Sequence, residues 1–235
     1  MDLNSDDIGR FVAWAKDFTQ LKTPRLVVRP LTLSDAEPLY DALKNPRVNT
    51  WISVYQQPFD LSALRRWLIP RIERMEQHEG IWAGVYPQGS TQPMGWVFAG
   101  LEADLGGVEL AGALGELYWG KGFVEEASFA LISDLMGAGL SRLVATCALN
   151  NYSSMRVLEA LNFERRHKIL LPRPQGARES WLYELTPDQW RKVRLLPLGD
   201  GLSPEEIKAR RLALMALCRE MKSARDYVET GSGTA

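Results

Sequence analysis

Apolar residues along this chain follow two periods, and the change from one to the other divides it into elements. Short apolar runs or two-residue alternation predict seven strands, at 25–31, 81–86, 93–101, 108–114, 142–149, 164–171 and 179–185. Helical spacing predicts helices over 1–20, from Ser34, over 60–78 and 123–136, after Asn151, and over 188–194 and 203–228. Ser34 and Glu37 are spaced as a capping box, and Asp60 is placed to cap the next helix.

The segment with two glycines, where the strand pattern changes to a helical one, is the first candidate for a binding site. The strand 108–114 is followed by Gly120 and Gly122, and the pattern becomes helical from Phe123. A helix N-terminus reached through glycines offers unpaired backbone N–H groups and the positive end of the helix dipole, which suit an anion such as phosphate. On its own, such a glycine pair is just as typical of a plain turn.

A second motif follows the next predicted strand. Asn151-Tyr152-Ser153-Ser154 opens a short helix that ends at Asn162-Phe163, where Asn tolerates left-handed geometry. Together with Trp119-Gly120-Lys121-Gly122 upstream, these residues resemble the GCN5-related N-acetyltransferases, GNAT. They are most similar to the branch that includes the ribosomal-protein N-terminal serine and alanine acetyltransferases.

The resemblance covers roughly Thr23 to Arg194 and implies a fold. We expect an α/β (α+β) GNAT architecture with a central, mixed, mostly antiparallel sheet of about seven strands, splayed between the fourth and fifth and flanked by helices. Residues 23–195 would form this domain, 1–22 an N-terminal helical extension, and 196–235 a C-terminal helical extension with a disordered tail. For the first extension, packing on the domain or on a sister subunit is favoured over a substrate lid.

The resemblance also implies acetyl-CoA as cosubstrate and direct attack by a primary amine on its thioester in a ternary complex. In relatives the diphosphate binds the glycine loop and the pantetheine arm lies along the fourth strand, where a backbone N–H near Ala113 faces the thioester oxygen. Asn151 matches a pantetheine contact, and Ser154 matches both a cofactor contact and the proton donor to the leaving thiolate. The cofactor-binding residues implied in this way are Ala113, Leu114, Trp119, Gly120, Lys121, Gly122, Phe123, Val124, Asn151 and Ser154. Helix capping is the alternative for Asn151 and Ser154.

The general base is not supplied by the motif. Arg173 stands where related enzymes carry a glutamate, and Leu158 stands where many carry a tyrosine acid. Glu109, at the start of the fourth strand, is the best remaining base, with Glu102 behind it. A carboxylate in a buried groove has a raised pKa, as a base requires. A structural acid paired with a neighbouring strand is the equal alternative for Glu109.

Two further features have plain explanations beside functional ones. Cys147 precedes Asn151 by four residues, and an inert core thiol is favoured over a disulfide with CoA. The basic run 165–168 is typical of a solvated strand face; as a functional feature it would favour an acidic or phosphate-bearing acceptor.

Composition and charge argue against several classes of protein, among them nucleic-acid-binding, metal-binding and membrane proteins. The net charge of −1 implies no polyanionic partner, so nucleic acid is not expected. Two cysteines and two histidines without ligand spacing make a metal site improbable. No apolar run approaches about 18 residues and the N-terminus is acidic, so we expect a cytoplasmic protein without a membrane span or signal peptide. A homodimer is a separate expectation, because the helices outside the domain are suited to docking on a second copy.

Two functions are therefore expected from the sequence. The first is an acyltransferase, an acetyl-CoA-dependent N-acetyltransferase acting on a protein N-terminus or a small-molecule amine. The alternative is a CoA-binding module that has lost catalysis, because both the usual tyrosine and the downstream glutamate are absent. Release of CoA thiol in the presence of an amine separates the two.

Overall fold

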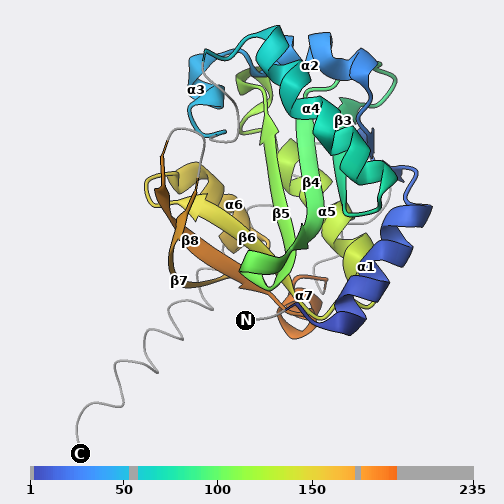
Figure 1. Ribbon diagram of the computed structural model, residues 1–235, viewed down its shortest axis with the longest axis vertical. Coiled ribbons are helices and arrows are strands. Elements are labelled where there is room, and N and C mark those ends of the chain that lie inside the picture. The colour runs from blue at the N-terminus through green and yellow to red at the C-terminus, as the bar shows by residue number, and fades with distance from the viewer. Residues whose placement is uncertain (1–2, 53–57, 173–175, 195–235) are drawn as a thin grey trace, which may run out of the picture.

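A single eight-stranded sheet forms the centre of the protein (Figure 1). The computed structural model describes residues 3–52, 58–172 and 176–194. The strand order is β1-β2-β3-β4-β5-β6-β8-β7, and every neighbouring pair is antiparallel except β5 and β6, which are parallel. The mixed, mostly antiparallel sheet is confirmed, and a two-residue edge strand adds to the seven expected. The strands are β1 Leu21–Lys22, β2 Leu26–Pro30, β3 Gly80–Pro87, β4 Gly95–Glu102, β5 Gly107–Leu114, β6 Leu143–Ala148, β7 Glu164–Leu171 and β8 Arg178–Leu185.

Helices cover both faces of the sheet (Figure 1). Helices α2 and α4 pack on one face, and α1, α5 and α6 pack on the other. The α-helices are α1 Ser5–Asp17, α2 Ala36–Leu43, α3 Pro46–Asn49, α4 Leu61–Glu76, α5 Phe123–Gly137, α6 Tyr152–Ala160 and α7 Pro187–Arg194. Three short 3₁₀ helices, η1 Leu33–Asp35, η2 Ala103–Leu105 and η3 Glu116–Tyr118, lie in the connections.

The two layers follow from the two-residue alternation of the central strands. On β4, Val97 and Ala99 point into the core shared with α5, whereas Trp96 and Phe98 point into the core beneath α2 and α4. All four side chains are at most 5% exposed. A strand buried on both faces reads as a nearly continuous apolar run, as 93–101 does.

The N-terminal helix α1 is built into the first of these cores. Phe11 is fully buried there, and Asn4 caps the helix by accepting from the Asp6 amide. Buried Asp7 accepts hydrogen bonds from the amide and hydroxyl of Ser141, at 3.0 and 2.6 Å. Because Ser141 follows the C-terminal end of α5, α1 packs on the domain as expected, away from the glycine loop.

The start of α2 differs from the expected capping box. The box forms at Thr32 and Asp35 instead, around the 3₁₀ turn η1, and Ser34 lies inside that turn. Asp35 is buried and also pairs with Arg29 at 3.0 Å, so this carboxylate is fixed by strand β2. The ion pair with Arg29, six residues before Asp35, therefore helps to decide which polar residue begins the helix. Asp60 caps α4 as expected, accepting from the Ala63 amide.

Several expectations fall outside the residues that the structure describes. These are the C-terminal extension 196–235 with its helix 203–228, and Arg173. Within the described ranges, no helix combines the length and apolarity needed to cross a bilayer.

Candidate active site

The sheet opens between β5 and β6. These strands are in register only at Val108 with Leu143 and at Glu109 with Val144. Beyond Glu109, residues 110–114 pair with β4 on one side and have no strand of the ladder on the other. Ala111 and Gly112 are consequently exposed although they lie in a central strand. Such an open edge offers backbone donors and acceptors to an extended ligand, which can bind as an additional strand.

The glycine loop ends at an uncapped helix N-terminus. Gly120 and Gly122 have φ values of 72° and 77°, the left-handed region that favours glycine. Gly122 is the N-cap of α5 and supplies no side-chain cap, whereas Asp60 and Asn151 cap α4 and α6. The helical hydrogen bonds begin with the Glu126 amide and the Gly122 carbonyl at 3.0 Å. The amides of Phe123 and Val124 precede it, so they face outward at the positive end of the helix.

Trp119 ties the loop to the open strand. Its indole Nε1 donates to the carbonyl of Leu114 at 2.7 Å, and its side chain is 41% exposed. Its amide donates to the Glu116 carbonyl at 3.1 Å, within the turn η3. The backbone of Trp119 is thus used to shape the turn, and the outward amides at the helix end are those of Phe123 and Val124. The side chain of Lys121 is exposed beside them.

Asn151 and Ser154 open α6 at the end of β6. The Asn151 Oδ1 atom accepts from the Ser154 amide at 3.2 Å, so the capping interaction is present. This cap uses only the oxygen of the Asn151 amide group and only the backbone of Ser154. The Nδ2 donor and the hydroxyl are not consumed by it, so a cap and a cofactor contact are compatible.

Cys147 is a buried thiol beside this turn. It is 3% exposed and its Sγ lies 3.5 Å from the carbonyl oxygen of Asn151. Burial raises the pKa of Cys147, and the side-chain hydrogen bond with Ser154 opposes that rise only partly. A thiol of raised pKa carries little thiolate at neutral pH, which agrees with an inert core role.

Glu109 lies where the two strands separate. Its Oε1 accepts from the Thr146 hydroxyl on β6 at 3.0 Å, so the side chain bridges the narrow end of the opening. This contact fits the structural alternative, while the place of Glu109 beside the opening fits the base. Glu102, the second candidate base, faces Arg74 at 3.8 Å.

The structure brings the implied cofactor residues to one opening. The Trp119 indole contacts Leu114, Ala113 lies next to it on β5, and Asn151 follows the end of the facing strand β6. Glu109 is four residues from Ala113, about 13 Å along the strand. The candidate general base Glu109 therefore lies at the narrow end of the opening, and the candidate acid Ser154 lies toward its wide end.

Two groups of contacts were not expected from the sequence. Arg25 and Thr23 bind Glu126 in the first turns of α5, and Asn45 and Arg47 of the α3 region both donate to Glu116. Their partners are 69 to 103 residues away in the chain, so no local spacing indicates them.

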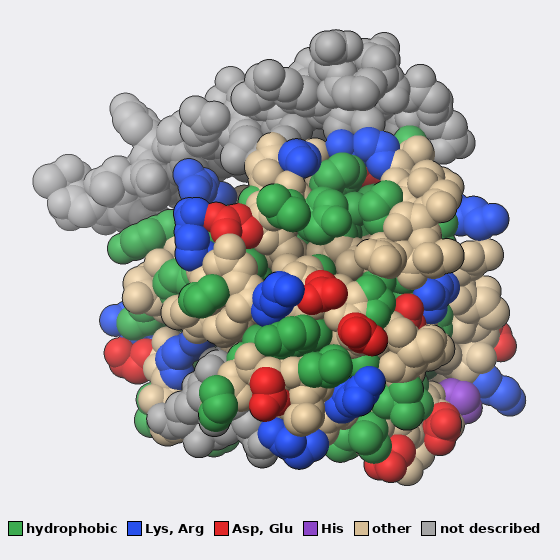
Figure 2. Space-filling view, turned by 90° about the horizontal axis from the view of Figure 1, so that it is seen from above, with side chains coloured by type: hydrophobic (Ala, Val, Ile, Leu, Met, Phe, Trp, Pro, Cys, Tyr) green, Lys and Arg blue, Asp and Glu red, His purple; other side chains and the backbone are tan. Residues whose placement is uncertain are grey.

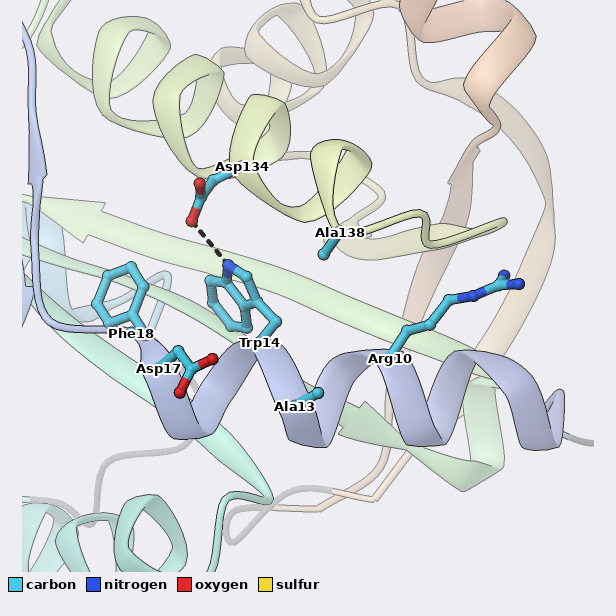
Figure 3. A pocket seen from close by; sticks show the side chains of 7 residues that line it. All are labelled: Arg10, Ala13, Trp14, Asp17, Phe18, Asp134 and Ala138. Carbon is cyan, nitrogen blue, oxygen red and sulfur yellow. Dashed lines mark hydrogen bonds between the residues drawn. The ribbon is translucent and has the colours of Figure 1, made fainter.

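A groove between α1 and α5 is a separate feature (Figure 3). It has a volume of about 470 Å³ and is lined by Arg10, Ala13, Trp14, Asp17, Phe18, Asp134 and Ala138. The Trp14 indole donates to Asp134 Oδ2 at 2.7 Å across it (Figure 3). Because the groove lies at the C-terminal end of α5, where the helix dipole is negative, it is unsuited to an anionic ligand.

Positively and negatively charged side chains are mixed on the face of the molecule seen in Figure 2. Among the described residues there, Lys and Arg lie interspersed with Asp and Glu and with hydrophobic side chains. The described residues also contain no group of three or more His, Cys, Asp or Glu that would hold a metal ion.

Comparison with known proteins assigns this fold and opening to one class. The family model for the acetyltransferase (GNAT) domain matches residues 25–164, which is more than half of the chain. The chain therefore belongs to the GNAT acetyltransferase family and is an acyltransferase. Membership implies acetyl-CoA as the cosubstrate, and the uncapped α5 N-terminus beside an open strand edge fits its diphosphate and its extended arm.

Individual relatives are distant. The chain is 26% identical over 148 residues to the uncharacterized N-acetyltransferase p20 of Bacillus licheniformis, covering 62% of this chain and 82% of that protein. A solved putative acetyltransferase from T. thermophilus superposes with a TM-score of 0.65 at 21% identity, covering 82% of this chain and 97% of that one. A putative ribosomal-protein-serine acetyltransferase from Vibrio cholerae gives 0.60 at 20% identity, covering 73% and 98%. At these identities the solved structures show the fold alone.

Proposed function

We propose that this protein is an N-acetyltransferase that transfers the acetyl group of acetyl-CoA to a primary amine in a ternary complex. The observation that carries the proposal is the parting of β5 and β6 next to the uncapped N-terminus of α5. One end of this opening offers outward amides for a diphosphate, and its length offers an unpaired strand edge for a pantetheine arm. Acetyl-CoA supplies the activated acyl group.

Each candidate residue then has a defined task. The Phe123 and Val124 amides hold the diphosphate, with the charge of Lys121 nearby, and the Asn151 Nδ2 group donates to the arm. A backbone N–H near Ala113 stabilises the negative charge that develops on the thioester oxygen. The nitrogen–carbon bond forms as the carbon–sulfur bond breaks, and the hydroxyl of Ser154 gives a proton to the departing thiolate while it takes one from a neighbouring water.

Proton removal from the acceptor is assigned to Glu109. The amine approaches on the face covered by α2 and α4, because Glu109 and Ala113 share that face with Trp96 and Gly100 through the β4 register. About 13 Å of strand lies between Glu109 and Ala113, which exceeds the reach of a carboxylate and one water, so the proton would pass along several waters. A general base of this kind contributes about 10²- to 10⁴-fold to the rate.

The class of amine acceptor is identified by an activity assay with a panel of amines. Protein, acetyl-CoA and a panel of amines are incubated, with release of CoA thiol and mass spectrometry of the acceptor as readouts. The panel contains peptides that begin with Ser or Ala, because two structural neighbours are described as ribosomal-protein-serine and S5-alanine acetyltransferases. Polyamines, amino acid derivatives and amine-bearing antibiotics complete it. Binding of CoA without turnover of any amine would instead favour a CoA-binding module, and no binding would refute both.

A further inference from the structure

A single arginine outside the glycine loop contacts three residues of the loop and the helix it opens. Arg25 Nη1 donates to the carbonyl of Lys121 at 3.0 Å, and its Nε donates to Glu126 Oε2 at 2.6 Å. Its guanidinium also lies 4.4 Å from the centre of the Phe123 ring. Arg25 immediately precedes β2, so these contacts tie the loop to a rigid strand.

The partner of Arg25 is an acid at the N-terminal end of α5, where Glu125 also lies. Glu126 lies in the first turns of α5, whose N-terminus faces the proposed diphosphate site. Its other oxygen accepts from the Thr23 hydroxyl at 2.6 Å and from the Arg25 amide at 3.1 Å. The Arg25 and Glu126 side chains are only 22% and 14% exposed, so solvent screens their charges weakly. Without Arg25, the Glu126 charge would oppose a diphosphate bound at the same helix end.

We propose that Arg25 is a positioning residue for the cofactor: it neutralises Glu126 and holds the Lys121 carbonyl so that the α5 amides bind the diphosphate. This inference rests on the proposed function and assigns to Arg25 a role in CoA affinity. It acts through Glu126 and the loop backbone. If the ion pair were purely structural, its loss would destabilise the fold and would weaken the binding of CoA and of pantetheine, which lacks the diphosphate, to the same extent.

The chain offers a matched control. Arg142 pairs with Glu184 at 3.0 Å, with side chains 17% and 16% exposed, and donates to the carbonyl of Gly106 at 2.6 Å. This arrangement reproduces the Arg25 geometry, an arginine that joins a carboxylate to a loop carbonyl. It lies at the opposite end of β5, where Gly106 precedes the strand.

The test compares affinities for CoA and for pantetheine, which lacks the diphosphate. Calorimetry and competition titrations are carried out with wild type, Arg25→Met, Glu126→Gln, the double variant and Arg142→Met. We expect Arg25→Met to raise the Kd for CoA about tenfold, the loss of one charge-assisted interaction, and to change the Kd for pantetheine less than about twofold. Glu126→Gln should bind CoA at least as tightly as wild type, and the double variant should recover about threefold of the loss.

Arg142→Met should lower the melting temperature and leave the affinity for CoA unchanged. The proposal is overturned if Arg25→Met binds CoA like wild type, if CoA and pantetheine weaken equally, or if Glu126→Gln restores nothing in the double variant. Should Arg25→Met not fold, Arg25→Lys keeps the charge but loses the two-partner geometry, and a smaller selective loss for CoA is expected; equal losses for both ligands overturn the proposal. Failure of the wild type to bind CoA would refute the proposed function itself.

Discussion

Replacing Gly120 by alanine should weaken cofactor binding as well as destabilise the fold. Gly120 has a φ of 72°, and a Cβ atom at this position meets no other atom within 4 Å. The left-handed conformation costs a non-glycine residue about 1–2 kcal/mol, so Gly120→Ala should lower the melting temperature by a few degrees. The new methyl would project into the space through which a diphosphate approaches the loop backbone.

The β3–β4 hairpin supplies an internal control for that experiment. Gly89 has a φ of 76° and equally open surroundings, but it lies in the turn between β3 and β4, outside the glycine loop. Gly89→Ala should therefore show the same thermal shift as Gly120→Ala. Only Gly120→Ala should raise the Kd for CoA, by about tenfold or more.

Differential scanning fluorimetry and calorimetric titration with CoA measure the two effects separately. Equal CoA affinities in the two variants would refute the assignment of the glycine loop to the diphosphate, even if both lose stability. A loss of affinity in Gly89→Ala equal to that in Gly120→Ala would attribute the effect to general destabilisation.

Three further changes test other parts of the site and fold. Asn151→Asp keeps the capping oxygen but removes the Nδ2 donor, so the melting temperature should change little while the KM for acetyl-CoA rises in a steady-state assay; an unchanged KM would leave Asn151 as a cap alone. Glu109→Gln should lower kcat/KM about 10²-fold and remove the acidic limb of its pH profile, and wild-type kinetics would exclude Glu109 as the base. For Asp35, burial raises the pKa, but hydrogen bonds from Arg29 and Thr32 outweigh burial and hold the pKa below its ordinary value. Its contribution to stability is therefore present above about pH 4 and is lost as pH falls through the lowered pKa. Asp35→Asn should then cost about 2 kcal/mol at pH 7, and in thermal unfolding the difference from wild type should shrink as pH falls below about 4; a difference independent of pH would contradict this.

The periodicity of the sequence predicts most of the fold. Strands 81–86, 108–114 and 142–149 became β3, β5 and β6 with small changes at their ends, because a strand buried on both faces of a sheet reads as a nearly continuous apolar run. The helices after Asp60 and Asn151 begin at those caps. The two-residue strand β1 was missed because an element that short has no period to detect.

The local motifs carry the resemblance that implies the opening, and the two glycines predict its loop, but neither indicates the contacts that hold them. The Thr32–Asp35 box formed in place of the expected one at Ser34, and Arg29, six residues before Asp35, pairs with that carboxylate. This spacing is local and is visible in the sequence. The Arg25–Glu126 pair spans 101 residues, so no local spacing indicates it. The surroundings that decide whether a carboxylate acts as a base depend on the tertiary arrangement in the same way.

A crystal structure of the protein with CoA tests the central claim most directly. The account predicts diphosphate oxygens within about 3.2 Å of the Phe123 and Val124 amide nitrogens, and the pantetheine arm along residues 110–114 with Asn151 beside it. CoA bound in the groove between α1 and α5, or anywhere that leaves the β5–β6 opening empty, would contradict it.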